Sequence, residues 1–457
     1  MKKLLIIATL AAVGMGACSK DDGVSAPEDL RKYVQVTIPE NAASGETRTS
    51  VDGTTTSWVA GYKVAVSLYN GSTTEVCEFT VDRTGATTTF SGSVPVGSYT
   101  CAAAHYPFCA ATFDAVNKTF THTWGDAYCS TDLAAYDFMF STVYETTTVL
   151  PIALTFRPLM ARIGMKLALG ANETPKYVTF TTDDNVLPTA GTVNADGTFS
   201  ASALTNSLTV ETDRKEFTVG LLPVGVASKM SVHVTTTDGM TYSDKSFQLA
   251  GLKRNTHYTM NVPCRTKRFM LTVPDGVNSK YGTGTYGDNG FFQVEPQYDP
   301  ESIFDGWHFL RSEIKSDKDA ADGDVLKNRN RIQLQAVSLG TNRAQNGAFV
   351  TPPIQCDGTK TVTVSFTAAT NKLTVGSVQY RIGVTNNGAD ISEDFLRSFD
   401  NIQSSLEGEC PWKHSGSVSR THTFTVTNGQ RIMMKVYSSG GGTPCHLELA
   451  DFTYTVE

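Results

Sequence analysis

The stretch at residues 33–38 reads YVQVTI, in which the apolar side chains of Val34, Val36 and Ile38 fall at every second position. Strict alternation over so short a run is typical of a half-buried β-strand, because successive side chains point to opposite faces of a sheet. The pattern recurs along the 457-residue chain, for example at Val64, Val66 and Leu68, with Gly, Asp, Asn and Pro between the runs. Helical periodicity is scarce, so the sequence predicts an all-β protein.

Length and charge narrow the class of protein. A chain of 457 residues is long enough for about three domains. The hydrophobic fraction of 40% and the charged fraction of 18% indicate folded domains with sizeable cores rather than a disordered polyelectrolyte. Asp and Glu total 45 against 38 Lys and Arg, for a net charge of −7. Because the net charge is negative, the surface does not on average attract the phosphates of nucleic acids, and we expect no nucleic acid partner.

The alternating runs fall into three blocks. The first two, at 32–155 and 156–265, each hold enough short strands for a two-sheet sandwich. The amino-acid composition changes near residue 265, where the sequence becomes rich in Gly, Tyr and Asp. The third set of alternating runs, at 266–457, suits a C-terminal jelly-roll β-sandwich. One helix is expected within this block, with Asp390 and Glu393 as a capping box.

The N-terminus has the layout of an export signal. Residues 1–17 contain two lysines, a short apolar run and then small residues, which together predict a signal peptide. Residues 15–18 resemble the bacterial lipobox, in which Cys18 is acylated, palmitate included, and becomes the mature N-terminus. Residues 18–31 are then a lipidated tether whose acyl chains hold the protein on the outer membrane. The alternative is ordinary cleavage, with Cys18 as a bystander.

Eight cysteines remain besides Cys18. An even number in an exported chain permits disulfides, but eight cysteines allow 105 pairings and no CxxC spacing occurs. Buried thiols that pack as small hydrophobes are the alternative, and the pairing stays open.

Several short motifs keep a common order through the first two blocks, and with them residues 1–265 resemble the fimbrillin family, the pilins and related surface lipoproteins of the Bacteroidota. Individually each motif is short, and the resemblance rests on their order. The motifs are Thr47-Arg48-Thr49 before Trp58, Gly61-Tyr62-Lys63, Gly97-Ser98-Tyr99, Tyr106-Pro107, Asp137-Phe138-Met139, Leu154-Thr155-Phe156, Met160-Ala161-Arg162, Leu221-Leu222-Pro223 and Gly251-Leu252.

The resemblance implies two transthyretin-like β-sandwich domains and a mechanism of assembly by strand exchange. An Arg-specific protease cuts after the first strand, that strand leaves, and a strand from another pilus subunit fills the groove. Here the displaced strand would carry Val34, Val36 and Ile38, and Arg48 is the only Arg in the following polar loop at 41–50. The alternative is that Arg48 is a surface residue that is never cut.

The third block suggests a ligand. It resembles carbohydrate-binding and galactose-binding modules, and sugar recognition needs an aromatic face beside hydrogen-bonding groups. Trp412, Lys413 and His414 supply such a set in a loop between predicted strands. Trp307 also adjoins a His, but its aromatic neighbours favour a place in the core. For Trp412 a core position is the alternative.

No cofactor or catalytic motif is recognisable. Asp317, Asp319, Asp322 and Asp324 surround a Gly and form a weak calcium candidate. The spacing departs from the EF-hand, so we favour an acidic surface loop. We expect no enzymatic activity, since no GxSxG, HExxH, Walker A or GxGxxG pattern occurs.

These features predict a surface-exposed outer-membrane lipoprotein of the fimbrillin type. A domain appended after the second sandwich would obstruct strand donation, which favours a tip or accessory pilus component, acting in adhesion and binding host or bacterial glycans. The alternative is a stand-alone glycan-binding lipoprotein outside any pilus. A glycoside hydrolase is a remote alternative, because a catalytic carboxylate pair leaves no sequence motif.

Overall fold

The structure is a computed structural model of the chain. It describes residues 31–37, 51–52, 55–56, 58–85, 88–145, 154–249, 251–273, 278–281, 291–293, 306–316, 326, 329–336, 346–371, 377–385, 391–411, 416–439 and 445–457.

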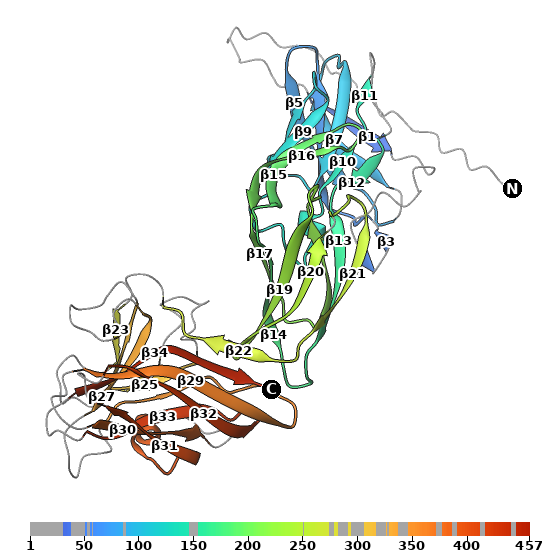
Figure 1. The fold of residues 1–457 in the computed structure, drawn as a ribbon. Helices are drawn as coiled ribbons and strands as arrows, with labels where there is room; N and C mark the ends of the chain where they lie inside the picture. The colour runs from blue at the N-terminus through green and yellow to red at the C-terminus, as the bar shows by residue number, and fades with distance from the viewer. Residues whose placement is uncertain are drawn as a thin grey trace, which may run out of the picture.

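The described part is all-β and consists of several sheets, arranged as an upright N-terminal body and a C-terminal body at its lower end in Figure 1. An eight-stranded sheet dominates the N-terminal end. Its apolar positions are those that the alternation predicts, and Val64 and Val66 are fully buried. In strand order it contains β1 (Arg31–Thr37), β6 (Thr89–Pro95), β5 (Thr74–Val81), β4 (Lys63–Tyr69), β7 (Cys101–Tyr106), β10 (Met139–Ser141) and β12 (Phe156–Pro158), while β11 (Tyr144–Glu145) pairs with β7, and β2 (Val51–Asp52) pairs separately with β3 (Thr55–Thr56).

The two N-terminal regions share a sheet. A hairpin from the first region, β8–β9, continues into β15 and β16 of the second, with Phe120 opposite Val193. A three-stranded sheet faces the same core, and its central strand β13 runs parallel to β21. The strands are β8 (Thr112–Asp114), β9 (Thr119–Thr123), β15 (Leu187–Asn194), β16 (Phe199–Thr205), β18 (Glu216–Leu221), β13 (Ala161–Ala168) and β21 (His257–Pro263).

An eleven-stranded sheet connects the second region to the C-terminal region through β22 (Lys267–Met270). Arg268 of β22 lies opposite Thr241 on one side and opposite Thr455 on the other. Figure 1 shows β22 in yellow, leading from the green body to the orange and red one. The other strands are β17 (Ser207–Glu211), β14 (Pro175–Thr182), β19 (Ser228–Thr236), β20 (Thr241–Leu249), β34 (Cys445–Val456), β27 (Arg331–Ala336), β26 (Ser312–Lys315), β23 (Asn278–Tyr281), β29 (Thr359–Asn371) and β32 (Val418–Thr427).

A six-stranded sheet completes the C-terminal region, and a core lies between it and the C-terminal part of the eleven-stranded sheet. Trp307 belongs to this core and is 1% exposed, which confirms its predicted core position. The strands are β24 (Phe291–Gln293), β25 (His308–Leu310), β28 (Ala348–Val350), β33 (Ile432–Ser439), β30 (Ser377–Val384) and β31 (Gln403–Pro411).

The described helices are short. Helix α1 (Leu133–Tyr136) begins after Asp132, and α2 (Glu393–Arg397) begins after Ser392, whose hydroxyl accepts a hydrogen bond from the backbone of Phe395. The prediction that Asp390 caps this helix is wrong, because a Ser next to the first turn takes that role. Among the described residues, no helix combines the length and apolarity needed to cross a bilayer.

Candidate functional site

In the part of the chain that the structure describes, the first strand lies at the edge of its sheet. β1 ends the strand order of the eight-stranded sheet and pairs with β6, from Arg31 opposite Pro95 to Thr37 opposite Thr89. Val34 and Val36 lie in this strand, opposite Gly92 and Phe90. An edge strand contributes one ladder of backbone hydrogen bonds, whereas a central strand contributes two.

The other residues singled out by the sequence fall outside the described part of the chain. This is so for the acylation candidate Cys18, for Ile38 and the cleavage candidate Arg48, for the ligand candidates Trp412, Lys413 and His414, and for the acidic set Asp317, Asp319, Asp322 and Asp324. They remain predictions. Within the described residues, no cluster of three His, Cys, Asp or Glu side chains is placed to hold a metal ion.

The described cysteines include buried thiols. Cys101, Cys129 and Cys356 are buried and are not in disulfides. Burial raises the pKa of the Cys129 thiol, with a further contribution from the charge of Asp126. A thiol held in its protonated form packs as a small hydrophobe and is a poor nucleophile.

A buried ion pair joins the first two regions. Arg162 of β13 contacts Asp137, which follows α1, and the two side chains are 11% and 1% exposed. Both residues belong to the motifs that carry the fimbrillin resemblance. Their pairing crosses the point where the chain leaves the first sheet at β12 and enters β13, so it ties the end of one region to the start of the next.

A larger polar cluster joins the second region to the C-terminal region. We call it the junction cluster: Glu173, Asp238, Tyr242, Lys267 and Gln355. Lys267 is 1% exposed, and its ammonium lies 2.7 Å from Asp238 and 2.9 Å from Glu173. Its third contact is the backbone carbonyl of Gln355 in the C-terminal region. All three N–H donors of the ammonium are therefore used.

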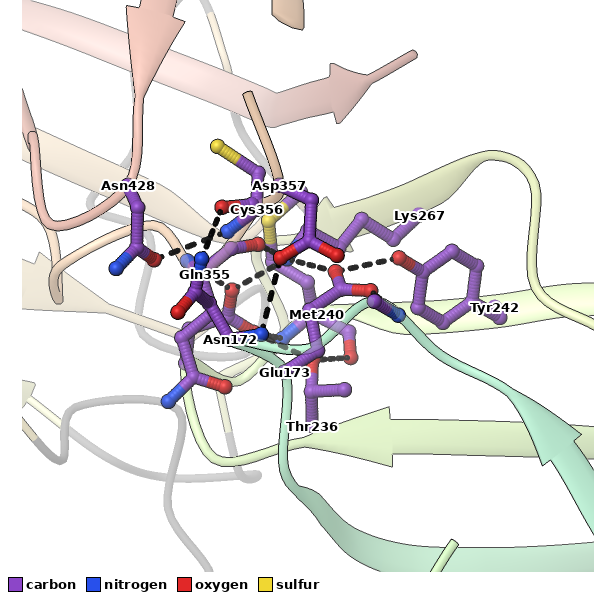
Figure 2. Close-up of polar contacts among 12 residues, drawn as sticks. Asn172, Glu173, Thr236, Met240, Tyr242, Lys267, Gln355, Cys356, Asp357 and Asn428 are labelled. Carbon is purple, nitrogen blue, oxygen red and sulfur yellow. Dashed lines mark hydrogen bonds and ion pairs between the residues drawn. The ribbon is translucent and has the colours of Figure 1, made fainter. Parts of the chain in front are cut away.

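The acceptors of the junction cluster are equally occupied (Figure 2). Asp238 Oδ2 accepts from Lys267 and, at 2.9 Å, from the backbone N–H of Gln355. Its Oδ1 accepts from the Thr236 hydroxyl at 2.5 Å and from the Met240 backbone at 3.2 Å. Both oxygens of the carboxylate are thus hydrogen-bonded, as a buried charge requires, and Oδ2 accepts from Gln355 of the C-terminal region.

A second set of contacts lies beside the cluster. Asp357 of the C-terminal region accepts from the backbone N–H groups of Ala171 at 2.5 Å and Asn172 at 3.0 Å. Gln355 receives a hydrogen bond from Thr174 through its side-chain oxygen and donates one to Thr237 through its amide nitrogen. These bonds cross from the second region to the C-terminal region, so the two regions are joined by side chains as well as by the shared strand β22.

Burial and the neighbouring positive charge shift the pKa of Glu173 in opposite directions. Burial favours its neutral form, but the Lys267 charge and hydrogen bonds from Lys267, Tyr242 and the Gly170 backbone outweigh it, and the pKa is lowered. The Tyr242 hydroxyl donates to Glu173 at 2.6 Å, and burial together with this bond raises the pKa of Tyr242. Glu173 is therefore ionised and Tyr242 neutral near neutral pH.

A groove of about 690 Å³ opens beside the junction cluster. Its floor is the outer face of β17, β14, β19 and β20, and β22 forms one end. The side chains that line it are mostly hydroxyl-bearing, with two aromatic rings, a thioether and two cations: Lys176, Tyr177, Thr179, Thr209, Thr235, Thr236, Thr237, Thr241, Ser243, Arg268, Phe269 and Met270, together with Gly239.

Neither the junction cluster nor the groove was predicted from the sequence. The members of the cluster lie in separate strands and loops between residues 173 and 355, and no local spacing links them. The one sequence feature that lies near the cluster is the change of amino-acid composition near residue 265, two positions before Lys267. Threonines at alternate strand positions are typical of an ordinary solvent-exposed face. The sequence therefore gives no indication that this face forms a groove.

Comparison with known proteins gives weak structural likenesses. A candidate cell adhesion protein from Bacteroides ovatus is 16% identical, with a TM-score of 0.32 over 52% of this chain and 93% of that chain. The C-terminally truncated tip fimbrial protein Mfa3 from Porphyromonas gingivalis is 11% identical, with a TM-score of 0.27 over 54% of this chain and 96% of that chain. The CBM22 tandem domain of Xyn10C from Paenibacillus barcinonensis is 12% identical, with a TM-score of 0.21 over 63% of this chain and 76% of that chain.

Among curated proteins, none matches this sequence. A sequence profile of the fimbrillin-like family, in contrast, matches residues 47–274. This range begins at the motif around Arg48, continues through the shared sheet of the two N-terminal regions, and ends just beyond β22. On that match, the chain belongs to the fimbrillin-like family.

Proposed function

We propose that this protein is a surface adhesin, held on the outer membrane by acylated Cys18, that joins another pilus subunit by exchange of its first strand. The observation that carries the proposal is the edge position of β1, which pairs with β6 at one end of the sheet. A strand at this position leaves by breaking one ladder and without separating two other strands.

The energetics favour replacement over simple loss. Departure of β1 would leave unpaired those backbone N–H and C=O groups of β6 (Thr89–Pro95) that point toward β1. Unpaired backbone groups beside an apolar core are costly. A strand from a second subunit restores both hydrogen bonds and burial, which is the physical basis of recognition by strand addition.

The C-terminal strand supports a tip or accessory role. β34 pairs with β22, β27 and β29, so it lies inside the eleven-stranded sheet. Donating it to a neighbour would open the core around Phe452 and Tyr454, which are at most 1% exposed. A subunit that accepts a strand but keeps β34 in its own sheet does not donate that strand to a neighbour.

Treatment with an Arg-specific protease tests the cleavage step. Wild-type protein should give oligomers that resist sodium dodecyl sulfate when a pilin partner with a free donor strand is present. Arg48→Ala should abolish them, whereas Arg83→Ala, at an exposed arginine of the same region, should not. Oligomers that persist unchanged in Arg48→Ala would rule out cleavage at this residue.

A reversible cross-link tests strand departure itself. Gln35 and Ser91 are opposite each other in β1 and β6, and directly opposed residues in antiparallel strands have Cα atoms about 4.5–5.5 Å apart, within disulfide range. The double variant Gln35→Cys with Ser91→Cys should block oligomer formation when oxidised and recover it on reduction. Equal oligomer formation in both states would refute strand exchange.

Anchoring is tested separately. Cys18→Ser should move the protein from the outer-membrane fraction to the soluble fraction, because the acyl chains on this residue supply the attachment. Unchanged membrane association of this variant would remove lipidation from the account. Neither outcome bears on strand exchange, which is measured in solution.

A stand-alone glycan-binding lipoprotein is the second candidate, and the groove beside the junction cluster favours it. For the loop proposed from the sequence, Trp412→Ala should lower glycan affinity if that loop binds sugar. Unaltered affinity would eliminate the loop. A protein that stays monomeric after cleavage, yet binds glycans, would fit this second candidate and exclude the first.

A further inference from the structure

The outer face of the second region carries an ordered row of polar side chains across four strands. Tyr177 of β14 lies opposite Thr235 of β19, Thr235 opposite Thr241 of β20, and Thr241 opposite Arg268 of β22. Directly opposed residues in antiparallel strands point to the same face. At about 4.8 Å per strand the row is about 14 Å long, enough for more than one sugar ring.

The hydroxyl groups are held in place by one another. The Oγ1 atoms of Thr235 and Thr241 are 2.9 Å apart, and those of Thr179 and Thr209 in the neighbouring row are 3.0 Å apart. A hydroxyl has one donor and two acceptor positions, so each bonded pair keeps one donor and several acceptor positions for another molecule. Donors and acceptors fixed before binding lose little entropy when a ligand arrives.

The rest of the groove supplies what hydroxyls lack. Tyr177 contributes an aromatic ring near one end, and Met270, at 58% exposed, contributes an apolar surface near the other. Arg268 is exposed and adds a planar array of donors. Hydroxyl ladders with interspersed apolar surface match a pyranose, which has a ring of hydroxyls and an apolar C–H face.

The junction cluster gives this groove a fixed shape. β22, which forms its end, begins at Lys267, and Lys267 is bound to Glu173, Asp238 and the Gln355 carbonyl. The groove volume of about 690 Å³ lies within the ~300–1,000 Å³ range of small-ligand sites, which often occur where domains meet.

We propose that this groove, between the outer face of β17, β14, β19 and β20 and the strand β22, binds an oligosaccharide of pyranose units. The inference deepens the adhesive function by naming a ligand class and rests on it, but it assigns the ligand to the second region and not to the loop of Trp412. An apolar lipid is disfavoured by the many hydroxyls. A polyphosphate is disfavoured because Lys176 and Arg268 are the only cations that line the described groove.

Binding of the full chain to an array of short neutral and uronic-acid oligosaccharides provides the test, followed by titration of the best array sugar. Thr241→Val removes one groove hydroxyl at constant shape and should weaken binding roughly three- to tenfold, as expected for one hydrogen bond. Arg268→Gln should weaken it by at least about tenfold.

A matched control is available in the same chain. Thr121 and Thr192 form an identical exposed hydroxyl pair, 3.0 Å apart, between β9 and β15. Thr121→Val should leave sugar affinity unchanged, and thermal unfolding checks that all three variants fold. The proposal is overturned if no array sugar binds, if Thr241→Val behaves like Thr121→Val, or if Trp412→Ala abolishes binding while the groove variants keep it. If the protein forms strand-exchange oligomers but binds no sugar, the proposed ligand site is wrong and the proposed assembly is unaffected.

Discussion

Replacing Lys267 by Met removes the cation of the junction cluster at nearly constant volume. Glu173 and Asp238 are 6% and 3% exposed, and after the substitution both would lie buried without their cation. Breaking a buried ion pair by removing one partner costs about 3–5 kcal/mol, because the remaining charge is uncompensated. We expect a loss of this size in the unit formed by the second and C-terminal regions.

Differential scanning calorimetry of the full chain measures the effect. For a unit of this size each kcal/mol corresponds to about 2–4 °C, so the transition that includes the junction should move down by roughly 6–20 °C. Limited proteolysis should also cut faster near residue 265 in the variant than in the wild-type protein. Lys166→Met is the control, since Lys166 and Glu216 form an ion pair whose side chains are 64% and 66% exposed, and exposed pairs contribute little.

A triple variant checks the cause. Lys267→Met combined with Glu173→Gln and Asp238→Asn removes the uncompensated charges and should recover much of the lost stability, because neutral groups are less costly to bury than unpaired ions. A downward shift of less than about 2 °C for Lys267→Met alone would refute the reasoning. So would a triple variant that is less stable than the single one.

Three further predictions concern charge and pH. The lowered pKa of Glu173 means that its contribution to stability is present above about pH 4.3, the unfolded value, and is lost as pH falls through the folded value, so acid titration of Glu173→Gln should lack this component. Arg162→Met leaves Asp137 buried without its partner and should cost about 3–5 kcal/mol in the N-terminal transition, and a loss below about 1 kcal/mol would contradict the pairing. Burial and the charges of Arg397 and Arg311 lower the pKa of Lys435 to about 7. Between this value and about pH 10 the folded state binds fewer protons than the unfolded state, so the free energy of unfolding should rise with pH across that interval. Lys435→Met should flatten the rise.

Local pattern predicted the strands well where one face is buried. The alternation at Val64, Val66 and Leu68 corresponds to β4, and all three side chains are fully buried. The aromatic neighbours of Trp307 correctly placed it in the core. These predictions succeed because the period of two is a property of the strand itself and needs no knowledge of its partners.

The pairing of strands that are distant along the chain could not be predicted from the sequence. β9 pairs with β15, and β22 links β20 to β34 across nearly two hundred residues of chain. Which edges meet is decided by tertiary packing, and no composition shift records it. The same holds for the junction cluster, where Gln355 meets Asp238 although 117 positions separate them. The helix cap was missed for a local reason, since Ser392, two positions after the predicted Asp390, caps the helix.

Hydrogen exchange of the full chain, with the backbone amides of β1 compared with those of β4, tests the exchangeable first strand most directly. The account predicts that amides within residues 31–37 exchange at least about 100-fold faster than those of β4, through an opening that frees β1 while the rest of the sheet stays protected. Equal exchange rates for β1 and β4, with both opening only in global unfolding, would contradict it.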